Sequence, residues 1–449
     1  MCSLLVCLAT PLRADGQTYT IKNLGTVAGV VPHVTGINAS GSVSGWYTAP
    51  NAGDRAVRYT EQGGWAQIPG LESLNSYALG INDHGDVVGY AILANGSVRA
   101  FRYTDGGSVE FVAPMAGGTY TIASGINNGG EITGYGDTAT STTAFRQSPG
   151  LLAQGIDTLG GAFSGGCGIN DSGQVAGIAL TSIGTQHGFR ASTDGTVAEI
   201  QGLTGPSSWS SACAIDASGA VTGQAEAGES AQHAFLYSDG SLMDLDAFGS
   251  SNSDGVSISG GVVVGNYTLA DGVSTHAFKY SATTGSVDLN TILPSGSGWV
   301  LAAATGVNTK GAMIGEGTLN GADAVWELAA PVDTTPPTIT SLTVSPATIK
   351  PNNHMAAVTV SVSATDNVDP QPSCSITSID AAQADPADMS ITGALTASIL
   401  AVKDSRGTDR TYTITVTCSD ASKNASIGQA TVLVSAGNGN SGKNNNKKP

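Results

Sequence analysis

The segment GINASGSVSG at residues 36–45 decides the fold of this chain, because variants of it return along most of the sequence. The spacing is about 44 residues, which is the length of one four-stranded blade of a β-propeller. Seven copies are recognisable, and they begin at Gly36, Gly80, Gly125, Gly168, Ala214, Gly255 (a degraded copy, GVSISGGVVVG) and Gly306. The spacing therefore predicts a repeat architecture.

Each repeat reads as four short strands. The Asn-x-x-Gly part of the motif is a tight turn, since Asn and Gly tolerate positive φ, and apolar strands flank it. A third strand follows, as in RAFRY at Arg99 and HAFLY at His233, and a fourth closes the repeat, as at residues 66–71 and 242–248. This pattern predicts a sequence of antiparallel sheets.

The two ends of the repeat region complement one another. The last repeat ends at Glu327 without a fourth strand, whereas TYTIKNLG at residues 18–25 is a spare strand before the first repeat. Pairing the two would close a ring and remove an exposed sheet edge. The alternative is an open β-solenoid, which needs no such ends and whose rungs are usually shorter. We expect an all-β fold, with a seven-bladed β-propeller at residues 18–330.

The repeat also resembles a named family. The Gly-Ile-Asn-x-x-Gly-x-Val-x-Gly segment followed by His-Ala-Phe-x-Tyr is similar to the HAF repeat of extracellular bacterial proteins, and the resemblance covers about residues 18–330. It implies export from the cell, but it implies no catalytic residues.

The remaining segments differ in composition. Residues 331–338 form a Pro- and Thr-rich linker, and alternating β-branched positions at residues 339–436 predict a small β-sandwich. Its motifs around Asp366, Cys374 and Cys418 are similar to bacterial immunoglobulin-like modules of the hyalin-repeat kind. Residues 437–449 are polar and of low complexity, so we expect a disordered tail.

Export is also indicated by residues 1–14, whose short apolar core is typical of a signal peptide; a buried first strand is the alternative. We therefore predict a secreted, extracellular or cell-surface monomer. In that compartment disulfides persist, and Cys374 and Cys418 are expected to form one. Cys167 and Cys213 each directly precede the motif in consecutive repeats, so they are a possible second bridge; two free, buried thiols are the alternative.

Charge excludes some partners. The formal net charge is −17, which repels phosphate backbones, so we expect no nucleic-acid partner. No apolar stretch is long enough for a transmembrane span. We expect no cofactor, and a polysaccharide or a protein as the ligand.

Few residues break the repeat, and only such residues would indicate a catalytic site. His187, His233 and His276 occupy one repeat position in different repeats, so a shared metal site is not expected. Among the carboxylates, Glu131 and Glu316 follow the repeat pattern least, so they are the candidates if a glycosidase or lyase site is present. We predict no catalytic residues and no metal ligands, and a non-catalytic binding or adhesion scaffold. A polysaccharide-degrading glycosidase or lyase and a structural stalk are the alternatives.

One repeat position offers candidate binding residues. The residue after the last glycine of the motif is Trp46, Tyr90 and Tyr135 in the first three repeats. Three neighbouring rings would form a platform on which sugars or a peptide could stack. The alternative is that these rings fill the wedge between adjacent sheets.

Overall fold

The computed structural model describes residues 12–14, 17–157, 159–228, 230–329, 333–367, 369, 371–382, 384–420 and 422–435. Residues 1–11 of the expected signal peptide and the expected disordered tail lie outside this part of the chain. The chain divides into two compact units, Met1–Pro331 (unit 1) and Val332–Pro449 (unit 2). Both consist of β-strands, with three short 3-10 turns in the described residues at Ala247–Gly249, Leu289–Ile292 and Pro386–Asp388. The expected all-β class is confirmed.

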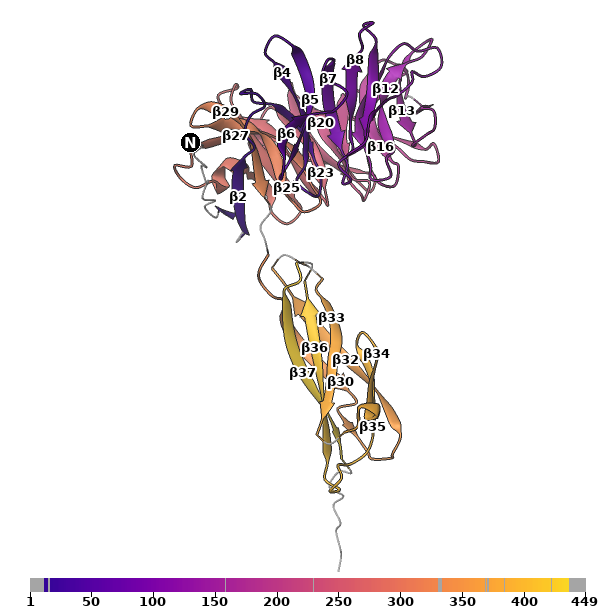
Figure 1. Ribbon diagram of the computed structural model, residues 1–449, viewed down its shortest axis with the longest axis vertical. Helices are drawn as coiled ribbons and strands as arrows, with labels where there is room; N and C mark the ends of the chain where they lie inside the picture. Colours follow the sequence, from indigo (N-terminus) through magenta and orange to yellow (C-terminus); the bar gives the residue numbers. More distant parts are fainter. Residues whose placement is uncertain are drawn as a thin grey trace, which may run out of the picture. The chain divides into compact units, whose positions relative to one another are not determined.

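In unit 1, the consecutive strands of each repeat pair antiparallel (Figure 1), and one parallel pairing, Thr142 opposite Phe163, joins the strands of the third and fourth repeats into one sheet. The first four repeats contain β3 (His33–Ile37), β4 (Val43–Ala49), β5 (Gly53–Thr60), β6 (Gly64–Gln67); β7 (Asn75–Ile81), β8 (Val87–Ile92), β9 (Val98–Tyr103), β10 (Val109–Phe111); β11 (Thr121–Ile126), β12 (Ile132–Asp137), β13 (Thr142–Gln147), β14 (Gln154–Gly155); and β15 (Gly160–Ile169), β16 (Val175–Thr181), β17 (Gln186–Ala191), β18 (Val197–Ile200). The last three contain β19 (Ser210–Ile215), β20 (Val221–Gly228), β21 (Ala231–Ser238), β22 (Ser241–Asp244); β23 (Ser253–Ser259), β24 (Val262–Thr268), β25 (Thr275–Ser281), β26 (Gly285–Asp288); and β27 (Trp299–Val307), β28 (Met313–Leu319), β29 (Ala322–Ala329).

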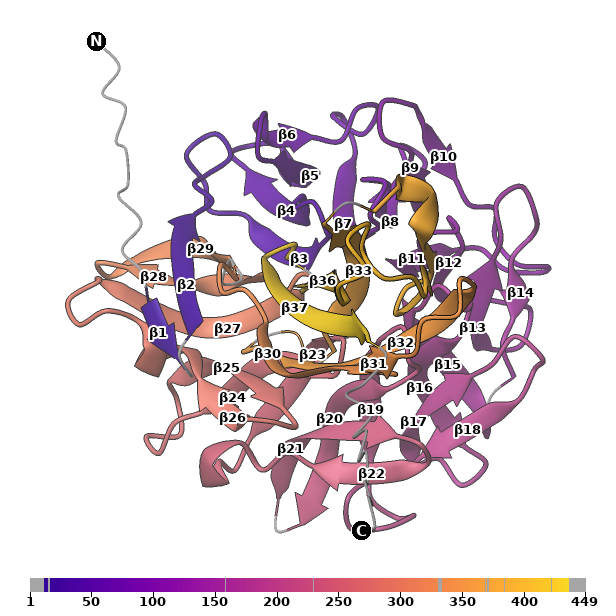
Figure 2. The ribbon, with the colours of Figure 1, turned by 90° about the horizontal axis from the view of Figure 1, so that it is seen from below.

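The sheets are arranged around a common axis (Figure 2). The first strand of each sheet contacts the first strand of the next, and β27 of the last repeat contacts β3 of the first. The ring is therefore closed on its inner side, as in a β-propeller.

The last sheet takes its outer strand from the start of the chain. Strand β2 (Gln17–Asn23) pairs antiparallel with β29, from Thr20 opposite Ala329 to Asn23 opposite Trp326, and β1 (Leu12–Ala14) pairs with β2. This is the pairing that the complementary ends predicted.

The third strand carries the core of each sheet. In the second to sixth repeats one position of this strand holds Phe101, Phe145, Phe189, Phe235 and Phe278, and in the first and last it holds Val57 and Val325; all seven side chains are fully buried. These rings pack among the small and branched side chains of the neighbouring sheets, which explains why the Phe recurs along the chain.

Unit 2 contains two four-stranded sheets, ordered β30-β32-β35-β34 and β31-β37-β36-β33. Their strands are β30 (Thr338–Ser345), β31 (Thr348–Ile349), β32 (Met355–Thr365), β33 (Ser373–Ala381), β34 (Met389–Gly393), β35 (Thr396–Leu400), β36 (Arg410–Ser419) and β37 (Ala425–Val434). Both sheets contribute to one core around Tyr412 and Ile414. The expected disulfide is present between Cys374 and Cys418, which lie opposite one another on β33 and β36.

Candidate functional sites

The Asn of the repeated motif links neighbouring sheets at one end of the inner strands. Each side-chain amide donates to the backbone carbonyl of the same position in the next repeat, at 2.8–3.1 Å; the pairs are Asn38 to Asn82, Asn82 to Asn127, Asn127 to Asn170, Asn170 to Asp216 and Asn308 to Asn38. The side-chain oxygen of the same Asn accepts backbone N–H groups of its own turn, for example from His84 and Asp86 to Asn82. The motif is therefore explained by ring structure.

The inner strands surround a cavity of about 220 Å³ on the ring axis. Every inner strand has a register shift typical of a β-bulge at one equivalent position, which is occupied by Cys167 and Cys213 in the fourth and fifth repeats. Those bulge residues line the cavity together with Thr35, Leu79 and Thr305.

The two cysteines of the possible second bridge both occupy bulge positions. Cys167 and Cys213 are free thiols, so the possible second bridge is not formed. A bulge redirects the side chain of its extra residue, and the Cys213 sulfur contacts the Ser211 hydroxyl at 3.8 Å. Burial raises the pKa of the Cys167 thiol to about 11 and that of Cys213 further in the same direction. Both are therefore thiols, with little thiolate character, near neutral pH.

The predicted aromatic residues lie at the opposite end of the inner strands from the Asn turns. The ring centroids of Trp46 and Tyr77 are 5.1 Å apart, and Tyr77 stacks on Tyr90 at 4.7 Å. Tyr135 contacts Tyr120 and Phe163, each at 6.4 Å. The Trp46–Tyr77 contact lies between two sheets, whereas the Tyr77–Tyr90 stack lies within one sheet. Trp46, Tyr90 and Tyr135 are half-buried, and ligand binding by these rings stays a prediction.

The candidate polar residues do not converge. His187, His233 and His276 each contact a carboxylate of the same sheet, namely Glu199, Asp244 and Asp288, at 2.7–2.9 Å. Glu131 accepts from Asn127 at the Asn turns, whereas Glu316 accepts from the Val34 N–H near the other end of the inner strands. The two glutamates therefore have separate structural partners.

Unit 2 contains a cluster that the sequence analysis missed, since it predicted no metal ligands. Asp333, Asp366 and Asp420 each place one carboxylate oxygen within 4.8 Å of the other two; we call them the aspartate cluster. Asp333 precedes β30, Asp366 follows β32 and Asp420 follows β36. Three distant loops thus bring their carboxylates together at one end of the sandwich.

One carboxylate oxygen of Asp333 in the aspartate cluster has no hydrogen-bond partner. Asp333 is 8% exposed and Asp420 is 6% exposed. Asp333 Oδ1 accepts from the Thr335 N–H at 3.0 Å, but its Oδ2 is buried without a hydrogen-bond partner. Both oxygens of Asp420 accept from Asn424, whose side chain also donates to the Asp333 carbonyl at 2.9 Å. The loops are therefore fixed to one another while a carboxylate oxygen of Asp333 is available to a ligand.

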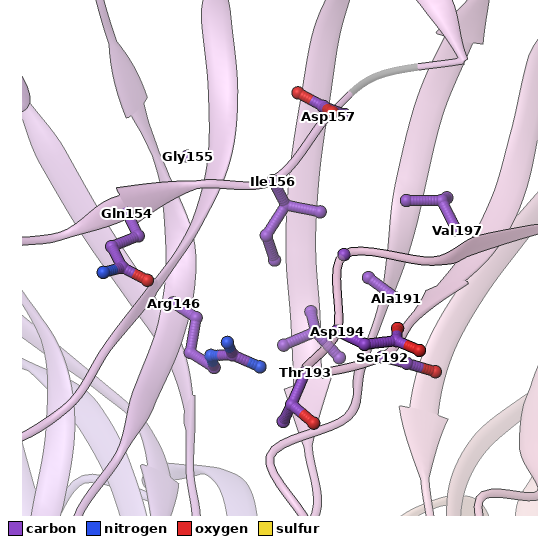
Figure 3. A pocket seen from close by; sticks show the side chains of 12 residues that line it. Arg146, Gln154, Gly155, Ile156, Asp157, Ala191, Ser192, Thr193, Asp194 and Val197 are labelled. Carbon is purple, nitrogen blue, oxygen red and sulfur yellow. The ribbon is translucent and has the colours of Figure 1, made fainter.

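Unit 1 also has a cavity of about 290 Å³ between the sheets of the third and fourth repeats (Figure 3). Its lining includes Arg146 and Ile156 from the third repeat and Ala191, Thr193 and Asp194 from the fourth. The outer strand β14 on one side of it has only two residues, Gln154 and Gly155, which both line the cavity.

Comparisons with known proteins concern the fold alone. No family model and no curated protein matches the chain. Among solved structures, a puromycin hydrolase S511A mutant is similar at 13% identity and a TM-score of 0.47, over 86% of this chain and 58% of that one. A puromycin-hydrolyzing peptidase from Mycobacterium tuberculosis is similar at 13% identity and a TM-score of 0.41, over 67% of this chain and 54% of that one. The β-propeller domain of the trilobed protease from Pyrococcus furiosus is similar at 8% identity and a TM-score of 0.43, over 66% of this chain and 93% of that one.

These structures correct one expectation. We expected a non-catalytic binding or adhesion scaffold, but several of the structures with a similar arrangement of sheets are those of peptidases and a hydrolase. The arrangement therefore does not indicate a non-catalytic protein. At these identities and TM-scores it does not assign a reaction to this chain either.

Proposed function

We propose that unit 2 binds a calcium ion through Asp333, Asp366 and Asp420. The observation that carries the proposal is the convergence of three carboxylates within 4.8 Å, at a place where Asp333 Oδ2 is buried without a hydrogen-bond partner. Ionised carboxylates that are so close repel one another, and burial adds a desolvation cost. A divalent cation would remove both costs.

The donor set favours calcium among the common cations. All three side chains offer hard oxygen ligands, whereas zinc sites are usually built with His or Cys. Calcium accepts six to eight oxygens in an irregular arrangement, to which backbone carbonyls and water contribute. Magnesium usually keeps several waters and is seldom held by a cage of protein side chains alone.

The ion would stabilise unit 2 by connecting its loops. The segment before β30, the loop after β32 and the loop after β36 each supply one ligand. At a calcium concentration of a hundred times Kd, binding to the folded state alone stabilises it by about 2.7 kcal/mol.

The test is calorimetric titration of the full-length, chelator-treated protein with CaCl₂, together with thermal unfolding in CaCl₂ and in EGTA. We expect one calcium ion per chain and a higher melting temperature of unit 2 in calcium. Asp333→Asn should weaken binding by about tenfold or more, because it removes one of the three charges.

Asp380→Asn is the matched control, since Asp380 is an exposed residue of the same unit outside the cluster. Calcium affinity should not change in this variant. Equal affinity of the wild-type protein and the Asp333→Asn variant would refute the site.

We also propose the finer architecture: a seven-bladed β-propeller of HAF repeats and an immunoglobulin-like module of the hyalin-repeat kind, in an exported protein. The repeat spacing and the closing strand β2 support the ring, and the disulfide of unit 2 supports an oxidising compartment. Calcium sites of extracellular modules operate at 10⁻⁴ to 10⁻³ M, which fits a site with three carboxylates.

A further inference from the structure

A column of arginines connects the sheets on the outer side of the ring. Arg58, Arg102, Arg146 and Arg190 occupy the same position of the third strand in the first four repeats. Each donates to a backbone carbonyl in the Asn turn of the next repeat, at 2.8–3.0 Å; the acceptors are Gly85, Gly130, Gly173 and Gly219. The shared role of these arginines is therefore structural.

Three of these arginines have a further partner for the guanidinium group, and for Arg102 it is Glu110 of its own sheet, at 2.6 Å. Arg58 lies over the ring of Tyr103 and pairs with Asp105 at 2.7 Å. Arg190 lies over Tyr237, at 5.5 Å from the ring centroid. These side chains fill the space between the outer halves of the sheets.

Arg146 lacks both kinds of partner. The position of Tyr103 is Ala191 in the fourth repeat, and the position of Asp105 is Thr193. Among the described residues Arg146 forms no ion pair, and the cavity of about 290 Å³ lies where the larger side chains would be. The cavity therefore lies where Ala191 and Thr193 replace the larger pair Tyr103 and Asp105 of the first junction.

The lining of this cavity carries both signs of charge. Arg146 reaches toward the cavity from the third repeat, and Asp194 lies on its opposite side in the loop before β18 (Figure 3). Asp157 is a second carboxylate of the lining. The Thr196 N–H donates to Asp194 and lowers the pKa of its carboxyl group, so this group is ionised near neutral pH. Ile156, Val175 and Val197 add an apolar wall.

We propose that this cavity binds a small zwitterion of the amino-acid class. The Arg146 guanidinium pairs with the ligand carboxylate, and Asp157 and Asp194 pair with its ammonium group. The apolar wall contacts an aliphatic side chain. A guanidinium group holds a carboxylate through two parallel hydrogen bonds, and it has the free N–H groups for them when no protein carboxylate occupies it.

The test begins with thermal-shift screening of the full-length protein against the proteinogenic amino acids, followed by calorimetric titration of those that raise the melting temperature. L-Leucine is then compared with 4-methylpentanoate, which lacks the ammonium group, and with isoamylamine, which lacks the carboxylate. Either analogue should bind at least about tenfold more weakly than leucine, since each loses one charged pair.

Two variants locate the binding. Arg146→Gln should weaken leucine binding about tenfold or more, and Arg190→Gln, which removes an equivalent arginine at a filled junction, should leave it unchanged. Thr193→Asp restores the carboxylate found at the first junction, so it should abolish binding while the protein remains folded. The proposal is overturned if no amino acid binds, or if Arg146→Gln and Thr193→Asp bind leucine as the wild-type protein does.

Discussion

The Asn of the repeated motif does two tasks at once, and this explains its recurrence. Its oxygen accepts N–H groups of its own turn, and its amide donates to the next sheet. The fifth repeat has Asp216 at this position, which retains the turn contacts but has no amide to donate. The direction of the bond is reversed there, because the Gly261 N–H donates to Asp216 Oδ2 at 3.1 Å. Asp216 has an oxygen where Asn has its amide nitrogen, and the backbone N–H of Gly261 in the next repeat replaces the lost donor.

The buried carboxyl group of Asp254 on β23 makes stability depend on pH. Burial raises its pKa from 3.8 to about 6, and its Oδ1 has no hydrogen-bond partner. The folded state therefore binds the proton more tightly than the unfolded state, so stability is lost as pH rises from about 4 to about 6. Asp254→Asn should stabilise unit 1 by up to about 3 kcal/mol at pH 7.5 and have little effect at pH 4.

Thermal unfolding of the wild type and of this variant at both pH values measures the effect. Asp323→Asn, at an exposed position of β29, is the control and should change neither value. A stabilisation by Asp254→Asn that is equal at pH 4 and pH 7.5 would exclude ionisation as its cause.

At the level of elements, β2 is the strand on which the closure of unit 1 depends. It supplies the partner of β29, and Tyr19 on β2 and Leu24 just after it are 5% and 4% exposed. The Tyr19 hydroxyl also accepts from the Lys279 amine on β25 at 3.0 Å, in the preceding repeat. Hence β2 joins two sheets and not only one.

A protein that begins at Thr26 should therefore be strongly destabilised. Loss of β2 exposes the edge of β29 and removes Tyr19, Ile21 and Leu24 from the core, so we expect the melting temperature of unit 1 to fall by about 10 °C or more. A protein that begins at Gln17 keeps β2 and is the control. Addition of a peptide with residues 17–25 should restore part of the loss; equal melting temperatures of the two truncated proteins would contradict the role of β2.

At the level of the molecule, the two units have separate cores. The described core of unit 2 contains residues of unit 2 alone, including the disulfide residue Cys418. No helix in the described part of the chain is long and apolar enough to cross a membrane. Each unit should therefore unfold in a transition of its own.

Removal of the disulfide tests this independence. The bridge joins residues that are 44 positions apart, which corresponds to about 4 kcal/mol of stability in the chain-entropy model. Cys374→Ser with Cys418→Ser should lower the melting temperature of unit 2 and leave that of unit 1 unchanged in calorimetry. A parallel shift of both transitions would show that the units unfold together. Cys167→Ala is a control for the removal of a thiol that forms no bridge.

The features that could be predicted from the sequence are those that recur in each repeat or complete the last one. The spacing of the Gly-Ile-Asn motif located the turns, and TYTIKNLG indicated the closing strand, because both are local patterns. The cavity beside Arg146 was missed since it results from small residues, Ala191 and Thr193, which are conspicuous only when the repeats are compared position by position.

The aspartate cluster could not be predicted in the same way. Asp333, Asp366 and Asp420 lie in three loops that are far apart in the sequence, and each also has the local turn contacts expected of any loop Asp. Only the pairing of the strands brings them together. Trp46 and Tyr90 both contact Tyr77, which the sequence analysis overlooked because it lies on the first strand and outside the motif.

The pairing of β2 with β29 also sets an order of events during synthesis. Strand β2 leaves the ribosome before all seven repeats, and its partner β29 is the last strand of unit 1 to follow. Until then β2 has no native neighbour, and no set of nascent repeats can complete the ring. Contacts between such distant segments are slow to form, and an unpaired strand is prone to aggregate. A chaperone that holds the nascent chain extended would therefore act before the ring closes. The yield of folded protein should depend more on the interval before closure than on the stability of any single repeat.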